Sequence, residues 1–202
     1  MNLYFDNAST SYPKPQAVGV AITHYLSECS GTYGRGFYPR VAKATALVER
    51  CRDKLGGILG VSPDNVFFNS GATMAANLVL KGLKFKSGAK ILFSGMEHNA
   101  VMRPLEFISK QTRLELIQLP TESDGRVAID KIDASMLDNV ALIIVNHQSN
   151  VNGVIQPVVE LMRLAEDIPL MLDATQSIST KGIPGFSAND KRPEYIIFSG
   201  HK

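Results

Sequence analysis

Residues 141–150 read ALIIVNHQSN, five apolar side chains followed at once by polar ones. The same change from apolar to polar recurs at KILFS (90–94), PLMLD (169–173) and YIIFS (195–199), and RLELIQL (113–119) is a further short apolar run. Such runs are typical of parallel strands that are covered on both faces. Segments with helical spacing of apolar residues alternate with them, at 72–83, 99–110 and 157–167. This order predicts an α/β fold, a three-layer, doubly wound, mostly parallel sheet.

Two amphipathic helices are predicted before the sheet, over 18–29 and 41–58, and the second is expected to end near the glycines Gly56, Gly57 and Gly60. The apolar run NVFF (65–68) predicts one more strand. Cys29 and Cys51 fall on the apolar stripes of the two helices, so both are expected in the core.

Composition excludes several classes of protein. The 202 residues carry 21 basic and 19 acidic side chains spread along the chain, without the basic stripe that nucleic acid attracts. No apolar stretch is long enough for a membrane helix, and the N-terminal MNLYFDNAST does not resemble a signal peptide. Two cysteines form neither a disulfide framework nor a metal-ligand spacing, so we expect no metal and a reducing compartment, the cytoplasm.

Polar residues at the predicted strand ends are candidates for a site, because open α/β sheets bind ligands beyond the carboxyl ends of their strands. We expect one crevice lined by Ser70, His98, Asn150, Asp173 and Ser199. Each residue by itself has a structural explanation. Asp173 and Ser70 suit helix caps or turns, and His98, like His147, suits a hydrogen-bonded histidine.

Taken together, these residues meet the needs of one cofactor. Gly71, Ala72 and Thr73 open a predicted helix, whose N-terminal amides suit a phosphate, although neither a Walker A loop nor a GxGxxG motif is present. An aspartate leaving an apolar strand can hold a proton on a ring nitrogen, an imidazole can stack on a flat ring, and Lys202 can form an imine with an aldehyde. This set of groups indicates pyridoxal 5'-phosphate.

The sequence resembles the class V aminotransferase family of fold type I pyridoxal phosphate enzymes, and within it the cysteine desulfurase and selenocysteine lyase branch. The resemblance rests on an ordered series of stretches: LYFDNASTSYPKP, FFNSGATMAANLV, EHNAVMRPL, VNHQSNVNGVIQPV, LDATQS and FSGHK. It implies that residues 1–202 are the N-terminal segment and most of the cofactor-binding large domain, truncated before the small C-terminal domain.

The resemblance also implies a role for each matching residue. Lys202 is the lysine of the Schiff base, Asp173 pairs with the pyridinium nitrogen and His98 stacks on the ring, and these three are the catalytic set. By the same resemblance, Gln176 and Asn150 lie beside the ring hydroxyl. The phosphate is bound by Ala72, Thr73, Ser199 and His201. Arg35, in the loop GTYGRGFYPR, is a weaker candidate for contacting the substrate.

The implied reaction is removal of sulfur from L-cysteine, or of selenium from selenocysteine, leaving alanine. By the same resemblance the enzyme is a homodimer, passes sulfur to an acceptor protein, and carries its nucleophilic cysteine beyond residue 202. Residues 1–202 are therefore expected to be inactive alone. Two alternatives stay open: transamination or another lyase reaction with the same cofactor, and a scaffold that keeps the fold without catalysis.

Overall fold

The computed structural model describes residues 3–165, 167–183 and 192–202, which fall into two units. One unit consists of residues 3–4 and 11–68, and the other of residues 5–10 and 69–202. The predicted loop over 182–193 lies mostly outside the described residues.

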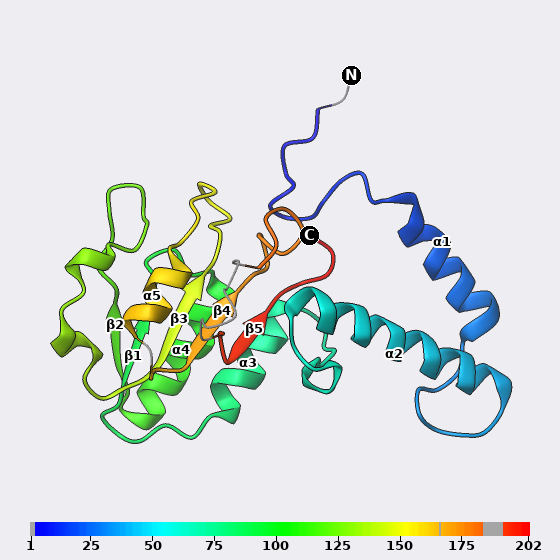
Figure 1. The fold of residues 1–202 in the computed structure, drawn as a ribbon, viewed down its shortest axis with the longest axis horizontal. Helices are drawn as coiled ribbons and strands as arrows, with labels where there is room; N and C mark the ends of the chain where they lie inside the picture. The colour runs from blue at the N-terminus through cyan, green and yellow to red at the C-terminus, as the bar shows by residue number, and fades with distance from the viewer. Residues whose placement is uncertain (1–2, 166, 184–191) are drawn as a thin grey trace. The chain divides into compact units, whose positions relative to one another are not determined.

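The second unit is built on a five-stranded sheet, which Figure 1 shows from green to red. Its spatial order is β2 (Glu115–Gln118), β1 (Lys90–Phe93), β3 (Val140–Asn146), β4 (Leu170–Asp173) and β5 (Tyr195–Ile197). Every neighbouring pair runs parallel. The chain order reverses between β1 and β3, and such a switch point is where open α/β sheets place their ligands.

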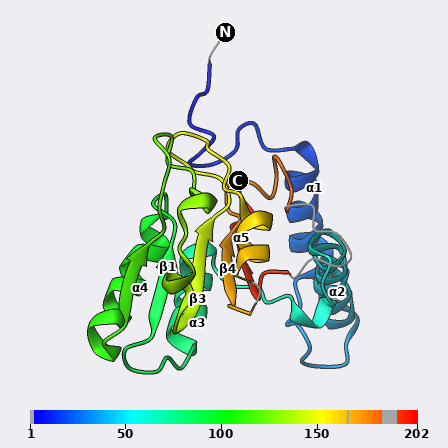
Figure 2. The same ribbon diagram turned by 60° about the vertical axis from the view of Figure 1, so that its left-hand side comes forward.

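Helices cover both faces of this sheet (Figures 1 and 2). Leu142 and Ile144 of β3 pack in one cluster with α3 (Ala72–Gly82) and α4 (Asn99–Thr112). The alternate residues Ile143 and Val145 pack in a second cluster, with α5 (Val158–Leu164). Successive strand residues point to opposite faces, so a continuous apolar run fills both clusters. The predicted three-layer, doubly wound parallel fold is confirmed.

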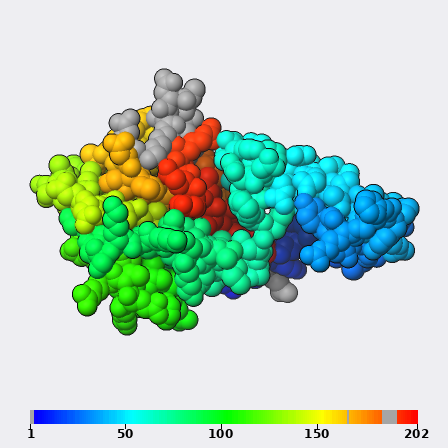
Figure 3. All heavy atoms as spheres, turned by 90° about the horizontal axis from the view of Figure 1, so that it is seen from below, coloured from blue at the N-terminus to red at the C-terminus, as the bar shows by residue number. Residues whose placement is uncertain are grey.

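Shorter turns complete this unit. The 3-10 turns η3 (Ile129–Lys131) and η4 (Ala134–Leu137) precede β3. In Figure 3 the red atoms of the C-terminal strand lie beside the blue-green atoms of α3, with which β5 is in contact. The N-terminus of α3 and the end of β5 therefore belong to one part of the molecule.

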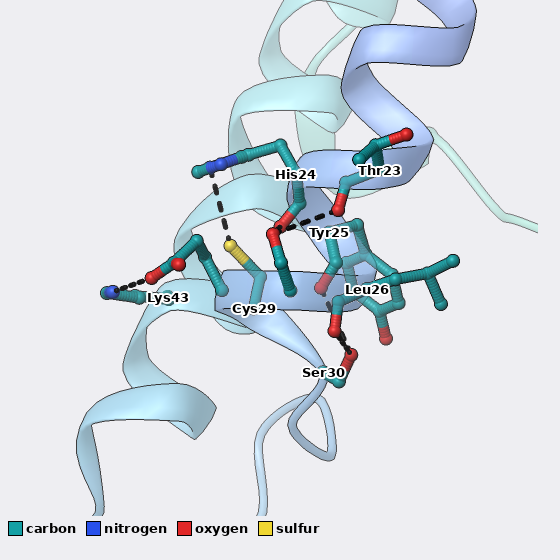
Figure 4. Close-up of polar contacts among 9 residues, drawn as sticks. Thr23, His24, Tyr25, Leu26, Cys29, Ser30 and Lys43 are labelled. Atoms are coloured by element: carbon teal, nitrogen blue, oxygen red, sulfur yellow. Dashed lines mark hydrogen bonds and ion pairs between the residues drawn. The ribbon is translucent and has the colours of Figure 1, made fainter.

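The first unit contains α1 (Gln16–His24), which continues as the π-helical turn η1 (Tyr25–Cys29), and α2 (Pro39–Leu59). Figure 4 shows the end of η1, where Ser30 Oγ donates to the carbonyl of Leu26 at 2.7 Å. The buried Cys29 Sγ lies 3.6 Å from His24 Nε2. Gly60 ends α2 in the left-handed conformation, at φ 66°, and is the last of the three glycines near which the sequence predicted the end.

The expectation that both cysteines are core residues is correct for Cys29 and wrong for Cys51, which is exposed. The buried residues of α2 gather at its two ends, where it contacts η1 and the 3-10 turn η2 (Pro63–Asn65). Cys51 lies between these two contacts, so helical periodicity alone gave the wrong exposure for it.

The predicted strand at 65–68 is also wrong. Residues 66–68 follow η2 without joining a sheet, and Phe67 and Phe68 are exposed. The Arg52 guanidinium lies 5.2 Å from the Phe68 ring centroid and donates to the carbonyl of Val66. A side chain from α2 therefore takes a backbone acceptor that a neighbouring strand would otherwise use. Among the described residues no helix has the length and apolar character needed to cross a bilayer.

Two adjacent glycines in α2 provide a matched test of the packing. A methyl group at Gly57 meets nothing within 4 Å, whereas one at Gly56 lies 2.9 Å from the carbonyl oxygen of Val61. We expect Gly57→Ala to raise the free energy of unfolding by about 0.5–1 kcal/mol, because alanine loses less backbone entropy in a helix. Gly56→Ala is expected to lower it. Denaturant unfolding of the full-length protein measures both, and equal effects would contradict this packing.

Candidate active site

A cavity of about 220 Å³ lies beyond the carboxyl ends of the strands, and we call it the strand-end pocket. The structure brings nine of the predicted site residues to its wall: Ala72, Thr73, His98, Asn150, Asp173, Gln176, Ser199, His201 and Lys202. Ser70 lies in an adjoining groove instead, with Gly71, Lys81 and Gly82. The pocket and the groove have four lining residues in common: Ala72, Thr73, Ser199 and His201. These residues, from the start of α3 and the end of the chain, form the wall between the two spaces.

The N-terminus of α3 provides donors on one side of the pocket. Gly71 precedes it at φ 125°, a conformation that favours glycine. Ala72 N donates to the buried Ser199 Oγ at 2.9 Å, and intrahelical bonding begins with Ala75 N. The amides of Thr73 and Met74 thus have no acceptor within the helix. Together with the helix dipole, these amides favour an anion.

Asp173 ends β4 and is buried, with 4% of its surface exposed. Its Oδ1 accepts a hydrogen bond from Thr175 N at 2.9 Å, and its backbone carbonyl accepts one from His147 N at 3.0 Å. The carboxyl group is thereby held at a wall of the strand-end pocket, where a cationic ligand group is its natural partner.

His98 caps α4, because its Nδ1 accepts a hydrogen bond from Ala100 N at 3.1 Å. An accepting Nδ1 carries no proton, so the neutral ring has its proton on Nε2. The cap fixes one edge of the imidazole while the ring lines the strand-end pocket.

His147 is a buried, hydrogen-bonded histidine, the structural alternative that the sequence left open. Its Nδ1 lies 2.7 Å from Ser177 Oγ, and its backbone carbonyl accepts from Gln156 N. Burial lowers the pKa of its imidazole below the ordinary value, which favours the neutral ring. His147 therefore ties the end of β3 to the turn that follows β4, next to Gln176.

Residues 5–10 cover part of the same site. Gln176 Nε2 donates to the carbonyl of Ala8 at 2.9 Å, and Thr10 Oγ1 lies 3.1 Å from His201 Nδ1. Ser9 lines the strand-end pocket. These contacts attach the start of the chain to the loop before Lys202.

Four residues of the pocket wall were not predicted: Ser9, Ala100, Asn146 and Thr175. Asn146 could have been predicted from the sequence, because it is the first polar residue after the buried apolar run of β3. Glu97 was also missed, and burial of its carboxyl raises its pKa to about 8. Hydrogen bonds from Ser94 and Asn146 oppose that rise, and the charge of Asp173 adds to it.

Arg35, the predicted substrate residue, is an exposed residue of the other unit. Within the described part of the chain, no group of three or more histidine, cysteine, aspartate or glutamate side chains could hold a metal ion. The groups available at the strand-end pocket are therefore the anion-binding amides of α3, a carboxyl, an imidazole and the amine of Lys202.

The model of the class V aminotransferase family matches residues 3–202. A probable cysteine desulfurase of Methanothermobacter thermautotrophicus is 30% identical over 206 residues, covering 100% of this chain and 50% of the relative. A cysteine desulfurase of Synechococcus elongatus is also 30% identical, covering 99% of this chain and 32% of the relative. The chain thus spans half or less of the length of these curated relatives.

Solved structures agree with this likeness. The apo structure of a cysteine desulfurase from Thermococcus onnurineus NA1 has a TM-score of 0.90 and 28% identity, with 99% of this chain and 50% of that chain covered. A NifS-like protein has a TM-score of 0.85 and 27% identity, with 100% and 55% covered.

Proposed function

Because the chain belongs to the class V aminotransferase family, we propose that it is part of a pyridoxal phosphate-dependent cysteine desulfurase, which takes sulfur from L-cysteine and leaves alanine. One observation carries the proposal: the candidate lysine, aspartate, histidine and anion-binding residues lie around one pocket. The cysteine desulfurases among its relatives support the choice of substrate. Selenocysteine is a second substrate of the same chemistry.

The groups on the pocket wall fit pyridoxal phosphate. A phosphate suits the first amides of α3, the Thr73 hydroxyl, Ser199 and His201. A flat ring suits the space between His98 and Asp173, and its hydroxyl suits Gln176 and Asn150. When bound, this cofactor supplies an electron sink for the bonds at the substrate α-carbon.

The protein's own residues have three tasks in this reaction. Asp173 holds a proton on the ring nitrogen, and its hydrogen bond from Thr175 N keeps the carboxylate oriented. His98 covers the ring and is held by its bond to Ala100 N. The amine of Lys202, on the pocket wall, would hold the cofactor's aldehyde and would serve as the base that moves the substrate α-proton.

We further propose that the enzyme works as a homodimer and passes sulfur to an acceptor protein. The thiolate that attacks the substrate sulfur is expected beyond residue 202. A thiolate nucleophile requires a reducing environment, so we place the reaction in the cytoplasm.

Substrate assays on the full-length protein test the proposal. With L-cysteine and a reductant we expect release of alanine and sulfide in equal amounts. Incubation with other amino acids and a keto acid tests transamination, because that reaction passes the amino group to the keto acid. We expect little transfer of the amino group in this assay. A keto acid-dependent amino transfer faster than alanine release would favour the aminotransferase alternative. A full-length protein without a covalent cofactor would favour the scaffold.

A further inference from the structure

Glu97 holds the turn between β1 and α4 against the end of β3. Its Oε1 accepts hydrogen bonds from Ser94 Oγ and from Asn146 N, each at 2.6 Å. Asn146 Nδ2 also donates to the carbonyl of Met96 at 3.1 Å, and Ser94 N donates to the carbonyl of Ile144 at 3.0 Å. The turn is therefore attached to β3 through both backbone and side chains, and the Glu97 carboxyl lies at the centre of these bonds.

This attachment places two walls of the strand-end pocket. His98 directly follows Glu97 and lines the pocket. Asn146, bonded to Glu97 through its amide, lines the pocket too and pairs in register with Asp173 on β4. The Glu97 carboxyl therefore connects the turn that carries the imidazole to the strand end beside Asp173.

The surroundings of Glu97 favour its neutral acid form. Its Oε2 is buried and has no hydrogen-bond partner among the described residues, whereas an ionised carboxylate needs donors at both oxygens. Its hydrogen-bonded neighbours are uncharged: Ser94, which follows β1, and Asn146, which ends β3. The charged group that acts on Glu97 is Asp173 of β4. Two close carboxyl groups do not both ionise readily, so one of them keeps its proton.

We propose that Glu97 is a positioning residue, a protonated acid that fixes the ends of β1 and β3 and leaves Asp173 as the carboxylate facing the ring nitrogen. The part concerning the ring nitrogen rests on the proposed function. The protonation and the attachment of the turn do not, so they are tested separately.

The first test compares stability with pH in the full-length parent and in Glu97→Gln. Glutamine keeps the Oε1 acceptor and cannot ionise. The pKa of Glu97 rises from 4.5 to about 8 in the folded protein, so folding retains a proton that the unfolded chain releases between these values. The stability that Glu97 contributes is therefore fully present below pH 4.5 and is lost as the pH rises to about 8. Relative to the variant, the parent's unfolding equilibrium constant is expected to rise up to about tenfold per pH unit in this window.

The second test measures position through the cofactor. Glu97→Gln is expected to keep the visible absorption band of the bound cofactor, its pH dependence and the parent's kcat. Glu97→Ala removes the acceptor for Ser94 and Asn146. We expect it to shift that band and to lower kcat by about 10–100-fold with a smaller change in KM, as small misplacements of catalytic groups do. Glu106→Gln, an exposed position on α4, is the matched control.

Each outcome decides the proposal. A glutamine variant as impaired as the alanine variant would show that holding the Oε1 acceptor is not enough, and would overturn the positioning role. An alanine variant equal to the parent would show that Glu97 positions nothing. If the alanine variant does not fold, the stability comparison remains decisive: no pH-dependent difference between parent and Glu97→Gln overturns the protonated form. That comparison measures unfolding and needs no enzyme turnover. It can therefore succeed or fail independently of the proposed function.

Discussion

Full-length protein carrying Lys202→Ala is expected to lose covalently bound pyridoxal phosphate and to turn over L-cysteine at least about 10³-fold more slowly. The reason is that one amine has two tasks, to hold the cofactor and to move the α-proton, and no other lysine lines the strand-end pocket among the described residues. Mass spectrometry after hydride reduction measures the covalent attachment, and alanine release measures turnover.

Two further variants separate these tasks from general effects of charge. Lys202→Arg keeps the positive charge, but arginine is not deprotonated in proteins, so it is expected to be as inactive as the alanine variant. Lys84→Ala, at an exposed lysine after α3, is expected to behave as the parent. A small primary amine added to Lys202→Ala should restore part of the proton transfer. Full activity of Lys202→Ala without added amine would show that the lysine is misassigned.

Asp173→Asn is expected to retain the fold and the cofactor while lowering kcat by about 10²–10³-fold, the scale of losing one preorganised electrostatic partner. Asparagine keeps the side-chain oxygen that accepts from Thr175 N, so the turn after β4 is preserved. What is lost is the negative charge at the ring nitrogen. Cofactor content, kcat and the primary isotope effect of α-deuterated cysteine measure the result, and we expect the isotope effect to increase.

Asp133→Asn is the matched control for this substitution. Asp133 Oδ1 accepts from Ser135 N at 2.7 Å in the same two-residue arrangement, but on an exposed turn. It is expected to leave kcat unchanged. If Asp173→Asn also had the parent's kcat, the role assigned to Asp173 would be wrong.

Much of the fold could be predicted because its signals are local. The apolar runs that became β1, β3, β4 and β5, and the helical spacing of α3, α4 and α5, each occupy a short stretch of sequence. The crevice rule then placed residues such as His98 and Asp173 near one another without knowledge of any contact. The predictions that failed depend instead on contacts between segments distant in the sequence. Whether residues 66–68 form a strand depends on a partner strand, and the exposure of Cys51 depends on where α2 is packed.

The sequence by itself determined the class of fold, the family and the set of polar residues at the strand ends, because periodicity and motifs are properties of neighbouring residues. The tertiary structure alone decided that Asn146 pairs with Asp173 and that Oε1 of Glu97 bonds to a strand 49 residues away. It also decided that Oε2 of the same carboxyl is buried without a partner. Burial and charge at one atom arise from segments distant in sequence, and these set the protonation of Glu97.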